Sequence, residues 1–263
     1  MSVVILQDEI VHYEVLGRGK PLIFLHGWVG SWRYWIPAMQ SASVSFRTYA
    51  LDLWGFGDSA KAANFYSVEQ QVNLINLFTQ EMGIGRIALI GHGLGAIIAT
   101  LYAAQNSKWV DRILAVSMPE NNQSLNARLS TAPPAELADW LPSRSADSES
   151  ARTEAPKTDA RAIQLSLSSL QRVDLNALTQ HTIPPCLLVY GQNDPAITVP
   201  LIQDQPSTLP EHMHQIVFES SGHFPMLDES SKFNRLLADF LNLNSGVSPR
   251  QLQLKEEWKR RVR

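Results

Sequence analysis

Short apolar runs alternate with longer helix-like segments through most of this chain, and this alternation constrains its fold more than any other feature. The runs RIALIG, at 86–91, and RILAVSMP, at 112–119, have the length and apolar content of buried strands. Between them LGAIIATLYAAQ, at 94–105, has the length and composition of a helix. Because strand and helix alternate from about residue 45 onward, the sequence predicts an α/β fold with a parallel sheet covered on both faces.

The start of the chain follows a different pattern from the rest. Residues 3–19 predict two strands around the polar turn at Asp8 and Glu9, and PLIFLHG, at 21–27, predicts a buried strand that enters a glycine loop. A segment at 32–40 is a candidate helix. The clearest helix spans 68–82, where Ser67 is suited to cap the N-terminus. Its large apolar residues share one face: Val68, Val72, Ile75, Phe78 and Met82.

The final units repeat the alternation. PCLLVYGQNDP, at 185–195, and HQIVFESSGHFP, at 214–225, each predict a strand, with a short helix between them. FNRLLADFLNL, at 233–243, predicts the terminal helix. The single cysteine, Cys186, excludes an intrachain disulfide and is expected to be a small apolar residue inside a strand.

The alternation breaks between Glu120 and Thr182, and the break defines the predicted domain organisation. From 143 to 162 no large apolar side chain occurs, so this stretch cannot form a core of its own. We predict a core domain of residues 1–120 and 182–245, interrupted by a lid insertion at 121–181. Within the lid, 163–178 is expected to be helical and docked, and the polar middle exposed or mobile; a long disordered loop without function is the alternative.

The net charge and the two ends of the sequence limit which binding partners and which location are expected. A net charge of −3 gives no general field for nucleic acid, and only the basic C-terminal tail, 246–263, offers a local basic patch. We expect this tail to be solvated, although a basic amphipathic helix around Trp258 is a second interpretation. The N-terminus has no basic leader, and no apolar window reaches the ~20 residues of a membrane span, so a cytoplasmic protein is expected.

Five glycine-containing motifs occur in a fixed order along the predicted elements. They are HGWVG (26–30), DLWGFGDS (52–59), GHGLG (91–95), GQND (191–194) and SGHFP (221–225). In this order and on these elements the chain resembles the α/β-hydrolase superfamily over nearly its whole length. The resemblance implies an α/β-hydrolase fold, with a mostly parallel eight-stranded sheet, helices on both faces and a small lid insertion.

The resemblance also assigns roles to individual residues. His223 is implied to be the catalytic base and Asp194 the acid that orients it, with Glu120 as the other place where the superfamily puts the acid. The backbone N–H groups of Trp28 and Leu94 are implied to form an oxyanion hole. An apolar, aromatic-walled substrate pocket is expected from five residues in the flanking loops: His26, Gly27, Trp54, Phe56 and Phe224.

Neighbouring residues are expected to be structural. His92 is implied to support the turn that it flanks, and the hydroxyl of Ser59 is expected to bond backbone. Trp32 and Trp35 are candidates for the pocket or for the core, and core packing is favoured for at least one of them.

Gly93 stands where the superfamily places its nucleophile, usually serine. Glycine has no side chain to attack a carbonyl, so covalent catalysis at this position is impossible. It also relieves the backbone strain of the sharp turn, about 1–3 kcal/mol for other residues. A natural replacement and an introduced one are both compatible with the sequence.

Three hypotheses therefore remain for the function. In the first, the protein binds an apolar small molecule without turning it over. In the second, it uses His223 and Asp194 as a general base without a covalent step, as in lyase or cofactor-free oxygenase chemistry. In the third, it is a serine hydrolase for ester-like substrates that is disabled at position 93. No cofactor, metal site or nucleic-acid partner is predicted, since no dinucleotide or phosphate fingerprint occurs and the histidines at 212 and 214 have no converging ligands. The sequence does not indicate an oligomeric state.

Overall fold

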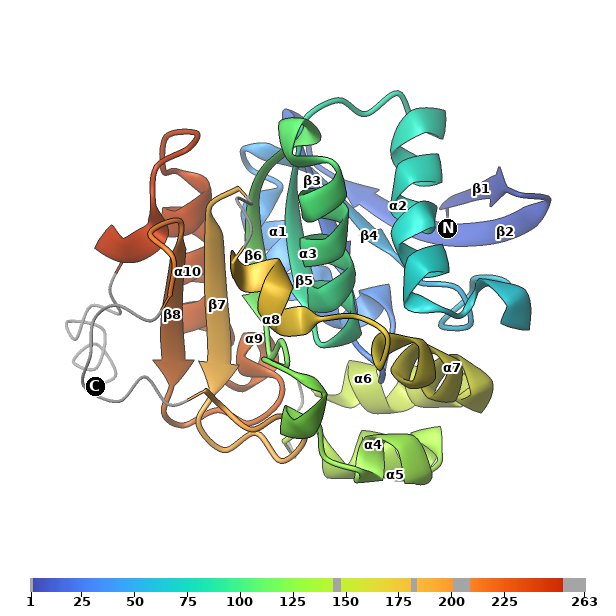
Figure 1. Cartoon of the computed structure of the whole chain (residues 1–263). Coiled ribbons are helices and arrows are strands. Elements are labelled where there is room, and N and C mark those ends of the chain that lie inside the picture. Colours follow the sequence, from blue (N-terminus) through green and yellow to red (C-terminus); the bar gives the residue numbers. More distant parts are fainter. Residues whose placement is uncertain (1, 144–147, 181–183, 201–208, 253–263) are drawn as a thin grey trace.

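The structure, a computed structural model, describes residues 2–143, 148–180, 184–200 and 209–252. Within these ranges one eight-stranded sheet runs through the molecule, in the order β1-β2-β4-β3-β5-β6-β7-β8. Only β2 runs opposite to its neighbours β1 and β4, and the remaining neighbours in the sheet pair in parallel (Figure 1). The predicted α/β architecture with a mostly parallel sheet is confirmed.

The antiparallel edge is a hairpin of β1 (Ser2–Leu6) and β2 (Glu9–Leu16). Its two turn residues, Gln7 and Asp8, both have positive φ, 51° and 64°. Such a two-residue turn matches the right-handed twist of the strands that it joins. The predicted pair of strands around this turn is therefore confirmed.

Six further strands form the buried part of the sheet, and apolar side chains fill both of its faces. β5 and β7 are buried at every residue, as expected for strands covered by helices on two sides. Cys186 lies in β7 and is buried, as predicted. The six strands are β3 (Lys20–Leu25), β4 (Phe46–Leu51), β5 (Ile87–His92), β6 (Val110–Val116), β7 (Cys186–Gly191) and β8 (Met213–Phe218).

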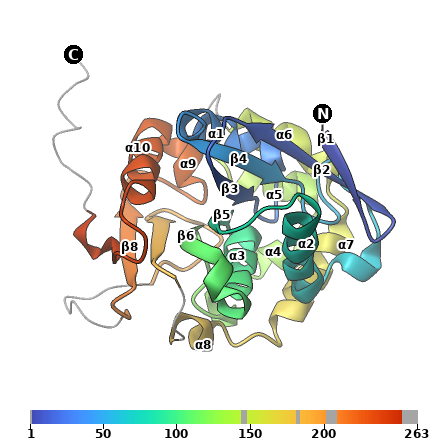
Figure 2. The same ribbon diagram turned by 90° about the horizontal axis from the view of Figure 1, so that it is seen from above.

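Helices cover both faces of the sheet (Figure 2). On one face α1 (Ile36–Ala42) packs against α10 (Ser230–Leu241), which follows the short α9 (Pro225–Asp228). On the other face α3 (Leu94–Gln105) lies between α2 (Val68–Glu81) and α8 (Leu175–Gln180). The hydroxyl of Ser67 accepts from the Gln70 N–H and caps α2, as predicted. No helix in the described ranges combines the length and apolar character that a membrane span requires.

The segment between β6 and β7 contains the insertion predicted to be a lid, and we use the name lid for this segment as a label of its position. Its described residues include α8 and four further α-helices. Figure 1 shows these four at the end of the molecule toward which the arrows of β7 and β8 point. They are α4 (Arg128–Thr131), α5 (Pro134–Trp140), α6 (Glu149–Glu154) and α7 (Ala160–Leu170). The predicted docking of the 163–178 part is confirmed, since Ile163 and Leu170 are buried.

The expectation that the polar middle of the lid is exposed or mobile is wrong for α6. Ala151 is fully buried and Glu154 is 3% exposed. Glu154 remains buried because Arg33 and Lys157 pair with its carboxylate, so the segment needs no large apolar residue to dock. Residues 144–147 lie outside the described residues, as do 201–208, where most of the predicted short helix between the last two strands would fall.

The first part of the C-terminal tail is partly buried beside β8 rather than fully solvated, since Pro249 and Leu252 are buried, which corrects a second expectation. The Arg250 guanidinium donates to the Leu209 carbonyl, Ser248 Oγ donates to the Glu211 carbonyl, and His214 Nε2 donates to the Leu252 carbonyl. These contacts hold 246–252 beside β8, because they satisfy polar groups next to an edge strand. The amphipathic helix, the second interpretation of the tail, would span 250–263, and of these residues 253–263 lie outside the described residues.

Candidate active site

The turn between β5 and α3 places Gly93 in a left-handed backbone conformation, with φ 50° and ψ −111°. A Cβ on Gly91 would lie 2.3 Å from the Gly95 carbonyl oxygen, and one on Gly95 would lie 2.3 Å from the Leu25 carbonyl oxygen. Only glycine fits these two positions. A Cβ on Gly93 would instead be 3.3 Å from the Trp28 ring, so a side chain there needs a shift of only a few tenths of an ångström.

His223 and Asp194 form a buried pair. His223 Nδ1 lies 2.8 Å from Asp194 Oδ2, and the two side chains are 1% and 0% exposed. The other carboxylate oxygen, Oδ1, accepts from the N–H groups of Ala196 and Ile197. Burial opposes the charge on Asp194, but His223 and these two N–H groups hold the pKa of its carboxyl below the usual value.

This arrangement determines the tautomer of His223. An ionised carboxylate only accepts hydrogen bonds, so Nδ1 carries the proton and Nε2 is left as the basic nitrogen. No described residue hydrogen-bonds to Nε2. Glu120, the alternative acid, is exposed, and Asp194 takes the Nδ1 bond.

Two backbone N–H groups beside Gly93 have no acceptor among the described residues, those of Trp28 and Leu94. Their neighbours are engaged, since the Gly27 N–H donates to Tyr34 Oη and the Gly95 N–H donates to the His26 carbonyl. Leu94 is also the first residue of α3, where the helix dipole adds positive potential.

The aromatic residues predicted to line the pocket are buried. Trp28 and Trp54 are each 1% exposed, and Phe56 and Phe224 are fully buried. Trp54 stacks on Phe65, with ring centroids 5.1 Å apart. Trp35 is also fully buried, so the core interpretation holds for it. The loops that carry these aromatic side chains are therefore closely packed, with little of the side chains exposed to solvent.

Lid helix α7 contacts this site directly, which the sequence did not indicate. Ser166, on α7, accepts a hydrogen bond at 3.1 Å from the indole Nε1 of Trp28. Ser166 is itself fully buried and donates to the Ile163 carbonyl. A serine in an amphipathic helix gives no sequence signal of such a contact, because its partner lies 138 positions away.

His92 has the structural role that was expected, whereas His26, predicted to line the pocket, uses both ring nitrogens for backbone contacts. His26 donates through Nδ1 to the Gly27 carbonyl and accepts through Nε2 from the Leu53 N–H, so it joins two site loops. His92 contacts Tyr34 and the His223 carbonyl, and burial holds its pKa well below the usual value. Ser59 Oγ donates to the Asp52 carbonyl, as predicted for a backbone-bonding hydroxyl.

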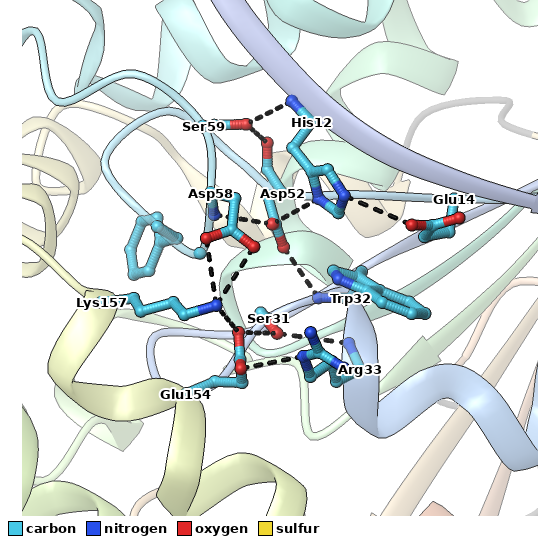
Figure 3. Close-up of polar contacts among 12 residues, drawn as sticks. His12, Glu14, Ser31, Trp32, Arg33, Asp52, Asp58, Ser59, Glu154 and Lys157 are labelled. Carbon is cyan, nitrogen blue, oxygen red and sulfur yellow. Dashed lines mark hydrogen bonds and ion pairs between the residues drawn. The ribbon is translucent and has the colours of Figure 1, made fainter. Parts of the chain in front are cut away.

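A cluster of charged side chains holds the lid on the core (Figure 3). Glu154 Oε1 lies 2.9 Å from Arg33 Nε, and Glu154 Oε2 accepts from Ser31 Oγ at 3.1 Å. Lys157 bridges Glu154 Oε2, at 3.2 Å, and Asp58 Oδ1, at 3.0 Å. We call Ser31, Arg33, Asp58, Glu154 and Lys157 the lid cluster.

The loops that carry the lid cluster are anchored on Asp52, which is fully buried. Its carboxylate accepts from the N–H groups of Trp32 and Asp58 and lies 2.8 Å from His12 Nδ1. Burial disfavours a charge on His12, but Asp52 raises its pKa above the usual value. These contacts bring ligand atoms of His12, Asp52 and Asp58 within 4.8 Å of one another.

A model of the alpha/beta hydrolase family matches residues 22–236 of the chain. The chain belongs to this family. Among curated members it is 24% identical over 256 residues to a pimeloyl-[acyl-carrier protein] methyl ester esterase of Vibrio vulnificus, covering 88% of this chain and 97% of that protein.

Solved alpha/beta hydrolase structures share the fold at low identity. An esterase from Exiguobacterium antarcticum superposes with a TM-score of 0.78 at 18% identity, covering 92% of this chain and 99% of that one. A serine-to-glycine mutant of an N-acyl homoserine lactonase, in complex with N-hexanoyl homoserine lactone, superposes with a TM-score of 0.75 at 19% identity, over 91% and 96%.

Proposed function

We propose that this protein binds an ester or lactone with its carbonyl carbon beside Gly93 and hydrolyses it without a covalent intermediate. The observation that carries the proposal is the buried 2.8 Å contact of His223 Nδ1 with Asp194 Oδ2, in which the His223 ring lies 4.6 Å, centroid to centroid, from that of His92, the residue before Gly93. Glycine offers no nucleophile, whereas a histidine with a free Nε2 deprotonates water as well as a hydroxyl group.

The reaction requires one water molecule and the ester. Nε2 of His223 takes a proton from the water while the water oxygen bonds to the carbonyl carbon, and the carbonyl electron pair moves onto its oxygen. The N–H groups of Trp28 and Leu94 donate to this oxyanion. The ester C–O bond then breaks, and the imidazolium returns its proton to the departing alkoxide. Asp194 stabilises the imidazolium through Nδ1–H without taking the proton.

The relatives support the substrate class. The curated relatives that match most of this chain are named as esterases of a pimeloyl-carrier methyl ester, and one structural neighbour held a lactone when a serine had been replaced by glycine. The buried aromatic side chains beside Gly93 favour an apolar acyl or alcohol group over a charged one.

The test is hydrolysis of p-nitrophenyl acetate and butyrate by the unsubstituted protein and by His223→Ala, purified in parallel. Removing a general base costs about 10²–10⁴-fold in rate, so we expect His223→Ala to lose at least roughly 10²-fold. The unsubstituted protein should show no burst of p-nitrophenol and no acyl adduct by mass spectrometry, since no covalent intermediate forms.

Two results would overturn the proposal in different ways. Equal rates for the unsubstituted protein and His223→Ala would remove the general-base role. Tight binding of an ester analogue without any turnover would instead identify a non-catalytic binding protein on the same fold.

A further inference from the structure

The hydroxyl of Tyr34 lies between two loops of the candidate site. It accepts from the Gly27 N–H at 2.6 Å, and it lies 2.9 Å from His92 Nδ1. Beyond the imidazole, His92 Nε2 lies 2.9 Å from the backbone carbonyl oxygen of His223. All of these groups are buried, with Tyr34 1% exposed and His92 fully buried.

Only one assignment of protons satisfies all three contacts. A carbonyl oxygen cannot donate, so His92 Nε2 carries the proton that the His223 carbonyl accepts. His92 is neutral because it is buried without a charged partner, so its Nδ1 accepts from the Tyr34 hydroxyl. The hydroxyl oxygen keeps its lone pairs for the Gly27 N–H. The result is one series of hydrogen bonds that runs from the Gly27 N–H through Tyr34 and His92 to the His223 carbonyl.

The two ends of this series of hydrogen bonds lie next to groups that the proposed reaction uses. Gly27 precedes Trp28, whose N–H would hold the oxyanion, and the other end is the backbone of His223 itself. A Cβ on Gly27 would lie only 2.9 Å from His92 Nδ1, so the two loops are already in close contact. Ser117, held at φ 47°, donates a second hydrogen bond at 3.1 Å to the same His223 carbonyl.

We propose that Tyr34 is a positioning residue that, through His92, sets the distance between the Trp28 N–H and the His223 imidazole. This inference rests on the proposed function, because it assigns Tyr34 to the same reaction. Tyr34 itself touches neither substrate nor water. A phenylalanine at 34 would keep the edge-to-face contacts of the ring with His92 and Phe224, so packing alone does not need the hydroxyl.

The first part of the test detects changes in the surroundings of the two histidine rings and does not require enzymatic activity. Histidine-¹⁵N NMR is recorded on the full chain, on Tyr34→Phe and on Tyr66→Phe. Tyr66 is an equally buried tyrosine, whose hydroxyl donates to Asp159 at 2.9 Å, away from the chain of bonds. We expect Tyr34→Phe to shift the His92 Nδ1 resonance and to shift or broaden the Nδ1–H proton signal of His223. Tyr66→Phe should change neither.

The second arm measures rate in a Gly93→Ser background. Displacing a positioned group by a fraction of an ångström costs about ten-fold or more, so we expect Tyr34→Phe to lower kcat roughly ten-fold with KM within about two-fold. An unchanged His223 signal in Tyr34→Phe, or the same change in Tyr66→Phe, overturns the proposal, and so does an unchanged kcat. Absence of turnover in the unsubstituted protein would refute the proposed function alone, because the NMR arm does not depend on it.

Discussion

The indole ring of Trp28 lies 3.3 Å from the place where a Cβ on Gly93 would stand, and its Nε1 donates to Ser166 of the lid. One side chain therefore contacts both the elbow and the lid. A larger residue at 93 requires a small movement of Trp28, and this movement is transmitted to α7 through a single 3.1 Å hydrogen bond.

The first prediction concerns restoring a nucleophile. Gly93→Ser should fold, since the tight contact is with a ring that is able to move, and should lose about 1–3 kcal/mol of unfolding free energy from the strain at φ 50°. It should hydrolyse p-nitrophenyl butyrate faster than the unsubstituted protein does, and with a burst that the unsubstituted protein lacks. Gly93→Ala, which has the strain without the hydroxyl, is the matched control. A faster reaction with a burst in both variants, or in neither, would contradict the prediction.

The second prediction concerns the lid cluster. Glu154→Gln keeps the shape of the side chain but removes the charge that Arg33 and Lys157 share. Both cations are more than a third exposed and regain water, so we expect a loss of about 1–2 kcal/mol rather than the larger cost of a stranded buried charge. Urea unfolding measures this loss of unfolding free energy. Arg161→Gln, which removes a 62%-exposed cation from its pair with Asp159, should lower the midpoint less than Glu154→Gln does.

The rate at which a protease cuts the lid would show whether the lid cluster keeps the lid closed or only stabilises the fold. If the lid cluster holds the lid closed, limited proteolysis should cut the lid of Glu154→Gln faster than that of Arg161→Gln under native conditions. Equal cleavage rates would show that the cluster contributes stability alone.

The third prediction concerns pH. Burial lowers the pKa of His26, His92, His212 and His214, so below pH 6.5 the unfolded chain binds protons that the folded chain does not. The contribution of these four histidines to stability is thus complete above pH 6.5 and falls as the pH decreases, by up to about 1.4 kcal/mol per pH unit for a fully buried group such as His92. The pKa of His12 is raised, so its contribution changes only above pH 6.5, in the opposite direction.

The measurement is the melting temperature between pH 7 and pH 5. His92→Gln retains an amide donor and acceptor but does not titrate, so its melting temperature should fall less steeply over this window. The same slope in both proteins would assign the acid sensitivity to other groups.

The fourth prediction concerns the C-terminal tail, which was expected from the sequence to be solvated. Because Ser248, Arg250 and Leu252 bond to groups at or beside β8, removal of 246–263 should lower the melting temperature more than removal of 253–263 does. The difference isolates the docked part. Identical melting temperatures would show that these contacts contribute no net stability.

Much of the site was predictable because it depends on local patterns. Glycines at 91 and 95 are required where backbones approach within 2.3 Å of an added Cβ, and such positions repeat as a motif in the sequence. The pairing of Asp194 with His223 followed from the order of the motifs along the chain. The contacts of Tyr34, Ser166 and Glu154 were not predictable, because each depends on a partner far away in sequence.

The sequence by itself determined the alternating strands and helices, the glycine-rich turn and the glycine at position 93, since these depend on residue type and spacing alone. The tertiary structure alone decided that the polar lid segment docks, that the start of the tail packs beside β8, and that Tyr34 connects two loops of the site. The physical reason is that a buried polar group is stable only with a partner in place. Which residues become partners is determined when the sheet brings distant loops together.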